Sequence, residues 1–213
     1  MVTSSRSGKA SLVSSTAEIK RLRRRDLPID TVELARYLVG KMLVHDLRGH
    51  RTSGRIVETE AYPVGDAAGH AFRGKTRRNA SLYLTRGHAY VYFIYGMYYC
   101  LNVSSERAGV GAGVLIRALE PVDGIDLMRE RRGAASLRDL ARGPGRVTIA
   151  MAIDGRYDGV DLCADSSLWL GASAGYHGVV SATTRIGLSR ERSRAWRFYE
   201  RGSTFVSGPS IRP

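Results

Sequence analysis

From Met42 onward, apolar residues recur mostly at every second position, in short runs that turn residues separate. A period of two sends alternate side chains to opposite faces of the chain, so these runs predict β-strands. The expected strands are 42–47, 55–62, 89–95, 100–104, 114–119, 169–171, 179–186 and 197–200, with a turn over 48–53. Because the strands cluster and do not alternate regularly with helices, we expect a single α+β domain, not a doubly wound parallel fold. Its mainly antiparallel, curved sheet should be flanked by short helices.

A helical period is confined to a few short segments. Asp30 is a suitable N-cap, Glu33 completes a capping box three positions later, and Gly40 can end the helix. The apolar residues between them fall on one helical face. The expected helices are 31–39, a short one between 121 and 132, and 146–152, which Gly143-Pro144-Gly145 opens.

The composition excludes several classes of protein. The chain has 213 residues, 43% of them hydrophobic, which suits one domain with a sizeable core. It contains no run of about 18 apolar residues and no apolar core of a secretory signal, so we expect neither membrane insertion nor export. Two cysteines, Cys100 and Cys163, cannot form a disulfide scaffold, and five scattered histidines do not predict a zinc site. A reduced cytoplasmic protein is expected.

A formal net charge of +13 predicts attraction to polyanions, nucleic acid before anionic membranes. Residues 1–25 are serine-rich and hold seven basic residues and one acidic residue. This segment is expected to be a disordered basic arm, or a solvated leader without a role. The remaining residues, 26–213, carry 26 basic and 19 acidic residues, so the globular domain is basic by itself.

The segment 55–62 carries two glutamates and a tyrosine in alternation. Glu58, Glu60 and Tyr62 share one face of a strand with Ile56, because strand side chains alternate. A carboxylate beside an aromatic ring can serve as a general base next to a stacking platform. The alternative is an edge strand with a solvated acidic face.

Five of the eleven tyrosines lie between residues 90 and 99. Tyr90 and Tyr92 share a strand face, whereas Tyr95 precedes Gly96 and should project from a turn. Aromatic rings stack on nucleobases, and a ring on a turn can wedge between base pairs. The alternative is that these tyrosines pack a core, but so many buried hydroxyl groups would need many partners.

Asn102 lies on the next strand, and Arg117 interrupts an otherwise apolar strand over 114–119. A guanidinium in such a strand is costly unless a carboxylate pairs with it. Glu60 is the candidate partner, and a structural ion pair with Glu120 is the alternative.

Together these motifs resemble the alkyladenine (3-methyladenine) DNA glycosylase family. The resemblance extends from about Leu34 to Gly202. The glutamate-bearing strand and the tyrosine stretch are specific together, because they occur in order and at matching spacing. The matching stretches are 55–62, His70 with Arg73-Gly74, Arg78-Asn79, 90–100 with Asn102, 115–121, Gly143-Pro144-Gly145, Arg197-Phe198-Tyr199 and Arg201-Gly202.

The resemblance implies a role for each matching residue. Glu60 is the general base that activates a water molecule, and Arg117 helps to hold that water and to keep Glu60 ionised. Tyr62 and Tyr92 sandwich a base flipped out of the duplex, with His70 at its edge. Such stacking favours a base that carries positive charge through cation–π attraction.

Three further residues receive roles from the same resemblance. Tyr95 is the wedge that fills the gap left in the duplex, and Met97 supports the wedge loop. Asn102 lines the pocket and collides with the exocyclic amino group of normal guanine.

The implied function is a DNA repair glycosylase. It flips alkylated purines, 3-methyladenine and related bases, out of double-stranded DNA and hydrolyses the N-glycosidic bond to leave an abasic site. Apart from Lys75, the motifs contain no lysine, so we expect a monofunctional enzyme without a lyase step. It should need no cofactor or metal, act as a monomer and associate with the nucleoid. The alternative is a non-catalytic nucleic-acid-binding protein on the same scaffold, which does not need the pair of Glu60 and Arg117.

Overall fold

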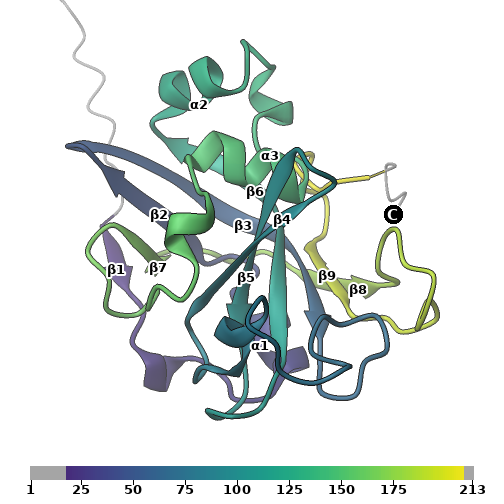
Figure 1. The fold of residues 1–213 in the computed structure, drawn as a ribbon. Helices are drawn as coiled ribbons and strands as arrows, with labels where there is room; N and C mark the ends of the chain where they lie inside the picture. The colour runs from purple at the N-terminus through teal and green to yellow at the C-terminus, as the bar shows by residue number, and fades with distance from the viewer. Residues whose placement is uncertain (1–17, 209–213) are drawn as a thin grey trace, which may run out of the picture.

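The computed structural model describes residues 18–208, which form one continuous antiparallel sheet with short helices around it (Figure 1). The strand order is β1-β7-β2-β3-β6-β5-β4, and β9 pairs with β3 and β8. The strands are β1 (Ile19–Arg21), β2 (Met42–Leu47), β3 (His50–Tyr62), β4 (Ala89–Ile94), β5 (Tyr98–Ser104), β6 (Gly113–Asp123), β7 (Leu168–Ser173), β8 (Val180–Thr183) and β9 (Arg197–Glu200). The expected α+β class with a mainly antiparallel sheet is confirmed.

The long strand β3 organises the sheet. Its first half pairs with β2, its second half pairs with β9, and β6 runs along most of its other edge. The register between β3 and β6 shifts near Gly54 and on both sides of Glu58. Such irregularities bend a strand and increase its twist, so β3 curves where it carries its glutamates.

The expected turn over 48–53 is wrong. The chain turns only at Arg48 and Gly49, where φ is 51° and 79°, and Leu47 pairs with His50. A two-residue turn with positive φ matches the twist of the strands beside it, which allows β3 to begin at His50.

The helices are α1 (Thr31–Leu38), α2 (Ile125–Arg131) and α3 (Pro144–Met151), with 3-10 turns at η1 (Arg24–Asp26), η2 (Ala80–Tyr83), η3 (Leu137–Asp139) and η4 (Gly155–Tyr157). The expected N-cap of α1 is confirmed, because Asp30 accepts hydrogen bonds from the backbone N–H groups of Val32 and Glu33. Leu34 and Leu38 are fully buried. Figure 1 shows α2 and α3 together at one end of the sheet, with α1 near the other.

Residues 18–25 belong to the fold, contrary to the expected disordered arm over 1–25; residues 1–17 lie outside the described part of the chain. The strand β1 pairs with β7 at the edge of the sheet, and Leu22 is buried. The guanidinium of Arg21 lies 4.5 Å from the centre of the Trp169 ring, and Arg24 pairs with Asp161. Basic side chains pack their apolar stems and stack on aromatic rings, so a run of positive charge does not by itself predict a solvated arm.

Several other boundaries differ from the expectation, and two of the differences concern residues near the site. The strand expected over 179–186 ends at Thr183, which leaves Arg185 and Ile186 in a loop. Tyr95 lies outside β4, in the turn. Within residues 18–208, no helix has the length and apolarity that a membrane crossing requires.

Candidate active site

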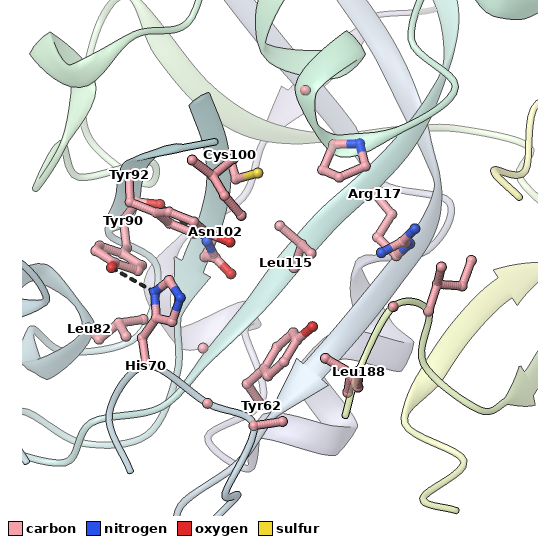
Figure 2. Close-up of a pocket in the computed structure, with 18 of the residues that line it drawn as sticks. Tyr62, His70, Leu82, Tyr90, Tyr92, Cys100, Asn102, Leu115, Arg117 and Leu188 are labelled. Atoms are coloured by element: carbon pink, nitrogen blue, oxygen red, sulfur yellow. Dashed lines mark hydrogen bonds between the residues drawn. The ribbon is translucent and has the colours of Figure 1, made fainter. Parts of the chain in front are cut away.

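A cavity of about 700 Å³ opens along neighbouring strands of the sheet. Strands β3, β4, β5 and β6 contribute its walls, and the loop after β3, the start of α3 and residues 186–188 border it. Figure 2 shows the labelled side chains of these segments converging on one space. Six of the eight predicted site residues line it, namely Tyr62, His70, Tyr92, Tyr95, Asn102 and Arg117.

Aromatic side chains form two sides of the cavity. Tyr62, at the end of β3, lies across the space from Tyr92 and His70 (Figure 2). The ring of Tyr92 lies 4.4 Å from that of His70 and stacks on Tyr90 at 5.2 Å, centre to centre. The amide of Asn79 donates to the backbone carbonyl of His70 at 2.9 Å, which fixes the loop that carries the imidazole. Facing aromatic walls suit a flat aromatic ligand.

Glu60 lies immediately behind this cavity and is fully buried. Its Oε1 accepts a hydrogen bond from the backbone N–H of Ile186 at 2.8 Å, and its Oε2 accepts one from the Tyr62 hydroxyl at 2.9 Å. The guanidinium of Arg117 lies 3.2 Å from the same Oε2. All three partners line the cavity, so Glu60 is connected to it on each side.

Glu58 is equally buried but differently bound. It accepts from the guanidinium groups of Arg117 (2.9 Å) and Arg197 (2.6 Å), and from the backbone N–H (2.5 Å) and hydroxyl (3.0 Å) of Ser207. Three of these four hydrogen bonds end on Oε1 and one ends on Oε2, so Glu58 accepts twice as many hydrogen bonds as Glu60. Glu60 accepts two hydrogen bonds from residues 18–208 and keeps acceptor capacity for a further donor.

Arg117 joins the two carboxylates. Burial opposes its charge, but Glu60 and Glu58 hold its pKa above the usual value, so the guanidinium stays protonated. The expected pairing with Glu60 is confirmed, and the alternative pairing with Glu120 is wrong, because Glu120 binds Arg55. The alternative of a solvated acidic face on 55–62 is also wrong, because β3 lies inside the sheet.

The turn between β4 and β5 presents aromatic and apolar side chains to solvent. Tyr95 and Gly96 both have positive φ, 55° and 67°, and the N–H of Met97 donates to the carbonyl of Ile94. Tyr95 is 85% exposed and Met97 is 64% exposed. A non-glycine residue in this conformation costs about 1–2 kcal/mol. In this conformation the ring of Tyr95 projects into solvent and does not pack in the core.

Asn102 lies on β5, opposite Tyr90 on one side and Leu115 on the other. It is buried and lines the cavity. Its amide nitrogen lies 3.5 Å from the backbone carbonyl of Tyr90, the outer limit for a hydrogen bond. The side-chain amide is therefore available to a ligand in the cavity.

Burial keeps the aromatic walls uncharged. It raises the pKa of Tyr62, with Glu60 adding to the effect, and it raises the pKa of Tyr90 to about 12. Burial, followed by the charge of Arg78, lowers the pKa of His70. The imidazole is therefore neutral at pH 7, and Arg117 is the cationic side chain next to Glu60.

Sequence reasoning missed several residues that bind Glu58 or Glu60. Arg197 and Ser207 bind Glu58, and Ile186 donates to Glu60, although 126 or more residues separate each from its partner. Arg185 is fully buried beside them. Arg185 lies within the expected strand 179–186, and this position could have drawn attention to it, because a guanidinium in a buried strand needs a carboxylate.

The chain is similar to known proteins. Residues 25–204 match the family model described as methylpurine-DNA glycosylase (MPG). A protein of Mesorhizobium japonicum is 57% identical over 202 residues, covering 95% of this chain and 97% of its own. A protein of Paraburkholderia phytofirmans is 56% identical over 188 residues, 88% of each chain. One from Carboxydothermus hydrogenoformans is 44% identical over 180 residues, 84% of this chain and 94% of its own. All three carry the name "Putative 3-methyladenine DNA glycosylase".

These matches identify a DNA glycosylase that acts in DNA repair, and its substrate is DNA. The chain belongs to the methylpurine-DNA glycosylase family. The resemblance inferred from the glutamate-bearing strand and the tyrosine stretch is thereby confirmed.

Proposed function

We propose that this glycosylase excises alkylated purines, 3-methyladenine and related bases, from double-stranded DNA by flipping them into the cavity between Tyr62 and Tyr92. The observation that carries the proposal is the contact of a fully buried carboxylate, Glu60, with both Tyr62 and Arg117 at the cavity wall. A protein that only bound DNA would have no use for a buried anion next to its binding pocket, because phosphates are anionic.

In the proposed reaction, Glu60 accepts a proton from a water molecule that attacks C1′ of the flipped nucleotide. The bond between C1′ and the base nitrogen breaks, and the base leaves with the bonding electrons. Alkylation at a ring nitrogen gives the base positive charge and makes it a better leaving group, so one activated water suffices. Arg117 stabilises the carboxylate of Glu60 in its ionised form.

The proposed enzyme is monofunctional. A lyase step needs an amine that forms a Schiff base with the sugar, and among residues 18–208 no lysine lines the cavity. Each proposed step uses side chains of this chain alone. We further infer that the enzyme acts as a monomer and associates with the nucleoid, because one chain carries the whole cavity and its net charge is +13.

Incubation with methylated duplex DNA tests this function. We expect release of free methylated purine and an abasic site whose strand stays intact until it is treated with alkali. Direct strand cleavage by the enzyme would contradict the monofunctional proposal. Binding without any base release would favour a non-catalytic DNA-binding role.

Tyr95→Ala is expected to reduce the flipped population of a lesion by about 10-fold or more, because stacking of an aromatic ring on a base is worth about 1–3 kcal/mol. A fluorescent base analogue beside the lesion reports flipping. The melting temperature should change little, since Tyr95 is 85% exposed. Phe93→Ala on the same hairpin is the matched control and should leave flipping intact. Unaltered flipping in Tyr95→Ala would remove the wedge from the mechanism.

Asn102→Ser is expected to change the ratio of guanine-type to adenine-type excision while keeping most alkyladenine excision. The shorter side chain makes room for the exocyclic amino group that distinguishes guanine at this wall. Both base types are measured with the same enzyme preparation, so a loss of folded protein cancels in the ratio. A lower melting temperature with an unchanged ratio would mean that Asn102 serves only the packing of β5.

A further inference from the structure

A buried cation lies against the ring of Tyr62. The guanidinium carbon of Arg185 is 4.6 Å from the centre of the Tyr62 ring and 5.1 Å from that of Trp196, so Arg185 lies over two aromatic side chains at cation–π distance. Its side chain has no exposed surface, and it is absent from the cavity lining, whereas Tyr62 lines the cavity. The charge of Arg185 therefore lies on the face of the ring that is turned away from the cavity.

The same guanidinium holds the surroundings of Tyr62 in place. It donates to the backbone carbonyl of Ala61 at 2.9 Å and forms a bidentate ion pair with Asp66, whose side chain is also fully buried. Asp66 in turn accepts from the N–H of Ala68, in the loop that leads to His70. Ile186, which follows Arg185 in the chain, donates its backbone N–H to Glu60. Arg185 is thus connected to both aromatic walls and to the carboxylate.

A cation on one face of an aromatic ring affects what binds the other face. The π electrons attract positive charge on either face of the ring. Because Arg185 already occupies one face of Tyr62, the ring attracts a second cation on its other face less strongly. A cationic base in the cavity is also repelled by the guanidinium through the ring, in surroundings of low dielectric constant. A neutral purine is not repelled in this way. The carboxylate of Asp66 offsets part of the repulsion.

We propose that Arg185 is a positioning residue that holds Tyr62 from behind and sets the preference of the cavity between cationic and neutral damaged purines, with its charge opposing cationic bases. This inference rests on the proposed function of Tyr62 as a wall for the flipped base. Asp66 tunes the same preference in the opposite direction, because it compensates the charge of Arg185.

The test compares dissociation constants for two duplexes, one with cationic 7-methylguanine and one with neutral ethenoadenine, at low temperature before base release. Removing both charges in Asp66→Asn/Arg185→Met avoids leaving a buried ion without its partner. This double variant should shift the ratio toward 7-methylguanine by about threefold to tenfold, the range expected for one cation–π contact. Asp66→Asn alone keeps the cation and removes its counterion, so it should shift the ratio toward ethenoadenine.

A purely structural role for Arg185 predicts weaker binding of both duplexes with an unchanged ratio, and that result would overturn the inference. If the double variant does not fold, as judged by circular dichroism, the opposite shift expected for Asp66→Asn decides the question. Wild-type enzyme that releases no methylated purine from methylated duplex DNA would refute the proposed function itself. Wild-type release together with an unchanged ratio in the variants refutes only the role of Arg185.

Discussion

Glu60→Gln is expected to lower the single-turnover rate of base excision by about 100-fold or more, the usual contribution of a general base, while lesion-containing DNA still binds. The amide keeps the size of the carboxylate but cannot accept the proton of the attacking water. Excision with saturating enzyme and binding by fluorescence anisotropy separate the two effects. A mutant that cuts at a rate near that of the wild type would exclude Glu60 as the base.

A matched control for this variant is Glu120→Gln on the neighbouring strand β6. Glu120 also pairs with an arginine, Arg55, but it is partly exposed and does not line the cavity. Its replacement makes the same change from carboxylate to amide and should leave the excision rate near that of the wild type. Equal losses in both variants would indicate a general effect of charge on DNA binding.

Glu58→Ala is expected to lower the free energy of unfolding by about 3–5 kcal/mol, the usual cost of removing one partner from a buried ion pair. The substitution leaves two buried guanidinium groups, those of Arg117 and Arg197, without their shared carboxylate. It also releases the backbone N–H and the hydroxyl of Ser207. Urea denaturation followed by circular dichroism measures the loss.

The comparison that decides this prediction is Glu120→Ala. Its ion pair with Arg55 lies closer to solvent, so its removal should cost less, about 1 kcal/mol or below. A smaller loss for Glu58→Ala than for Glu120→Ala would contradict the structural role assigned to Glu58. If Glu58→Ala is unfolded, Glu58→Gln provides a milder variant, because its amide oxygen can still accept from one guanidinium.

The site shows how far reasoning from the sequence extends. Alternation along β3 predicts that Glu58, Glu60 and Tyr62 lie together. In the structure Arg117 contacts both glutamates, and Tyr62 donates to Glu60. Alternation cannot rank the two glutamates, because both occupy the same face. Their difference arises from Arg197 and Ser207, which are 139 and 149 residues from Glu58 and donate hydrogen bonds to it but not to Glu60. Distant segments therefore separate a structural carboxylate from the one next to the cavity.

In the fold, too, some features follow from local sequence and others from contacts between distant segments. Local chemistry in the sequence determined the strands, the capped helix that begins after Asp30 and the exposed turn at Tyr95-Gly96, because periodicity, capping and backbone strain depend on neighbours a few residues apart. Tertiary structure alone decided that Ile19–Arg21 joins the edge of the sheet, that β9 continues the pairing of β3, and that Arg185 lies behind Tyr62. These contacts join segments far apart in the chain, and their stability comes from burial and charge pairing that no local pattern encodes.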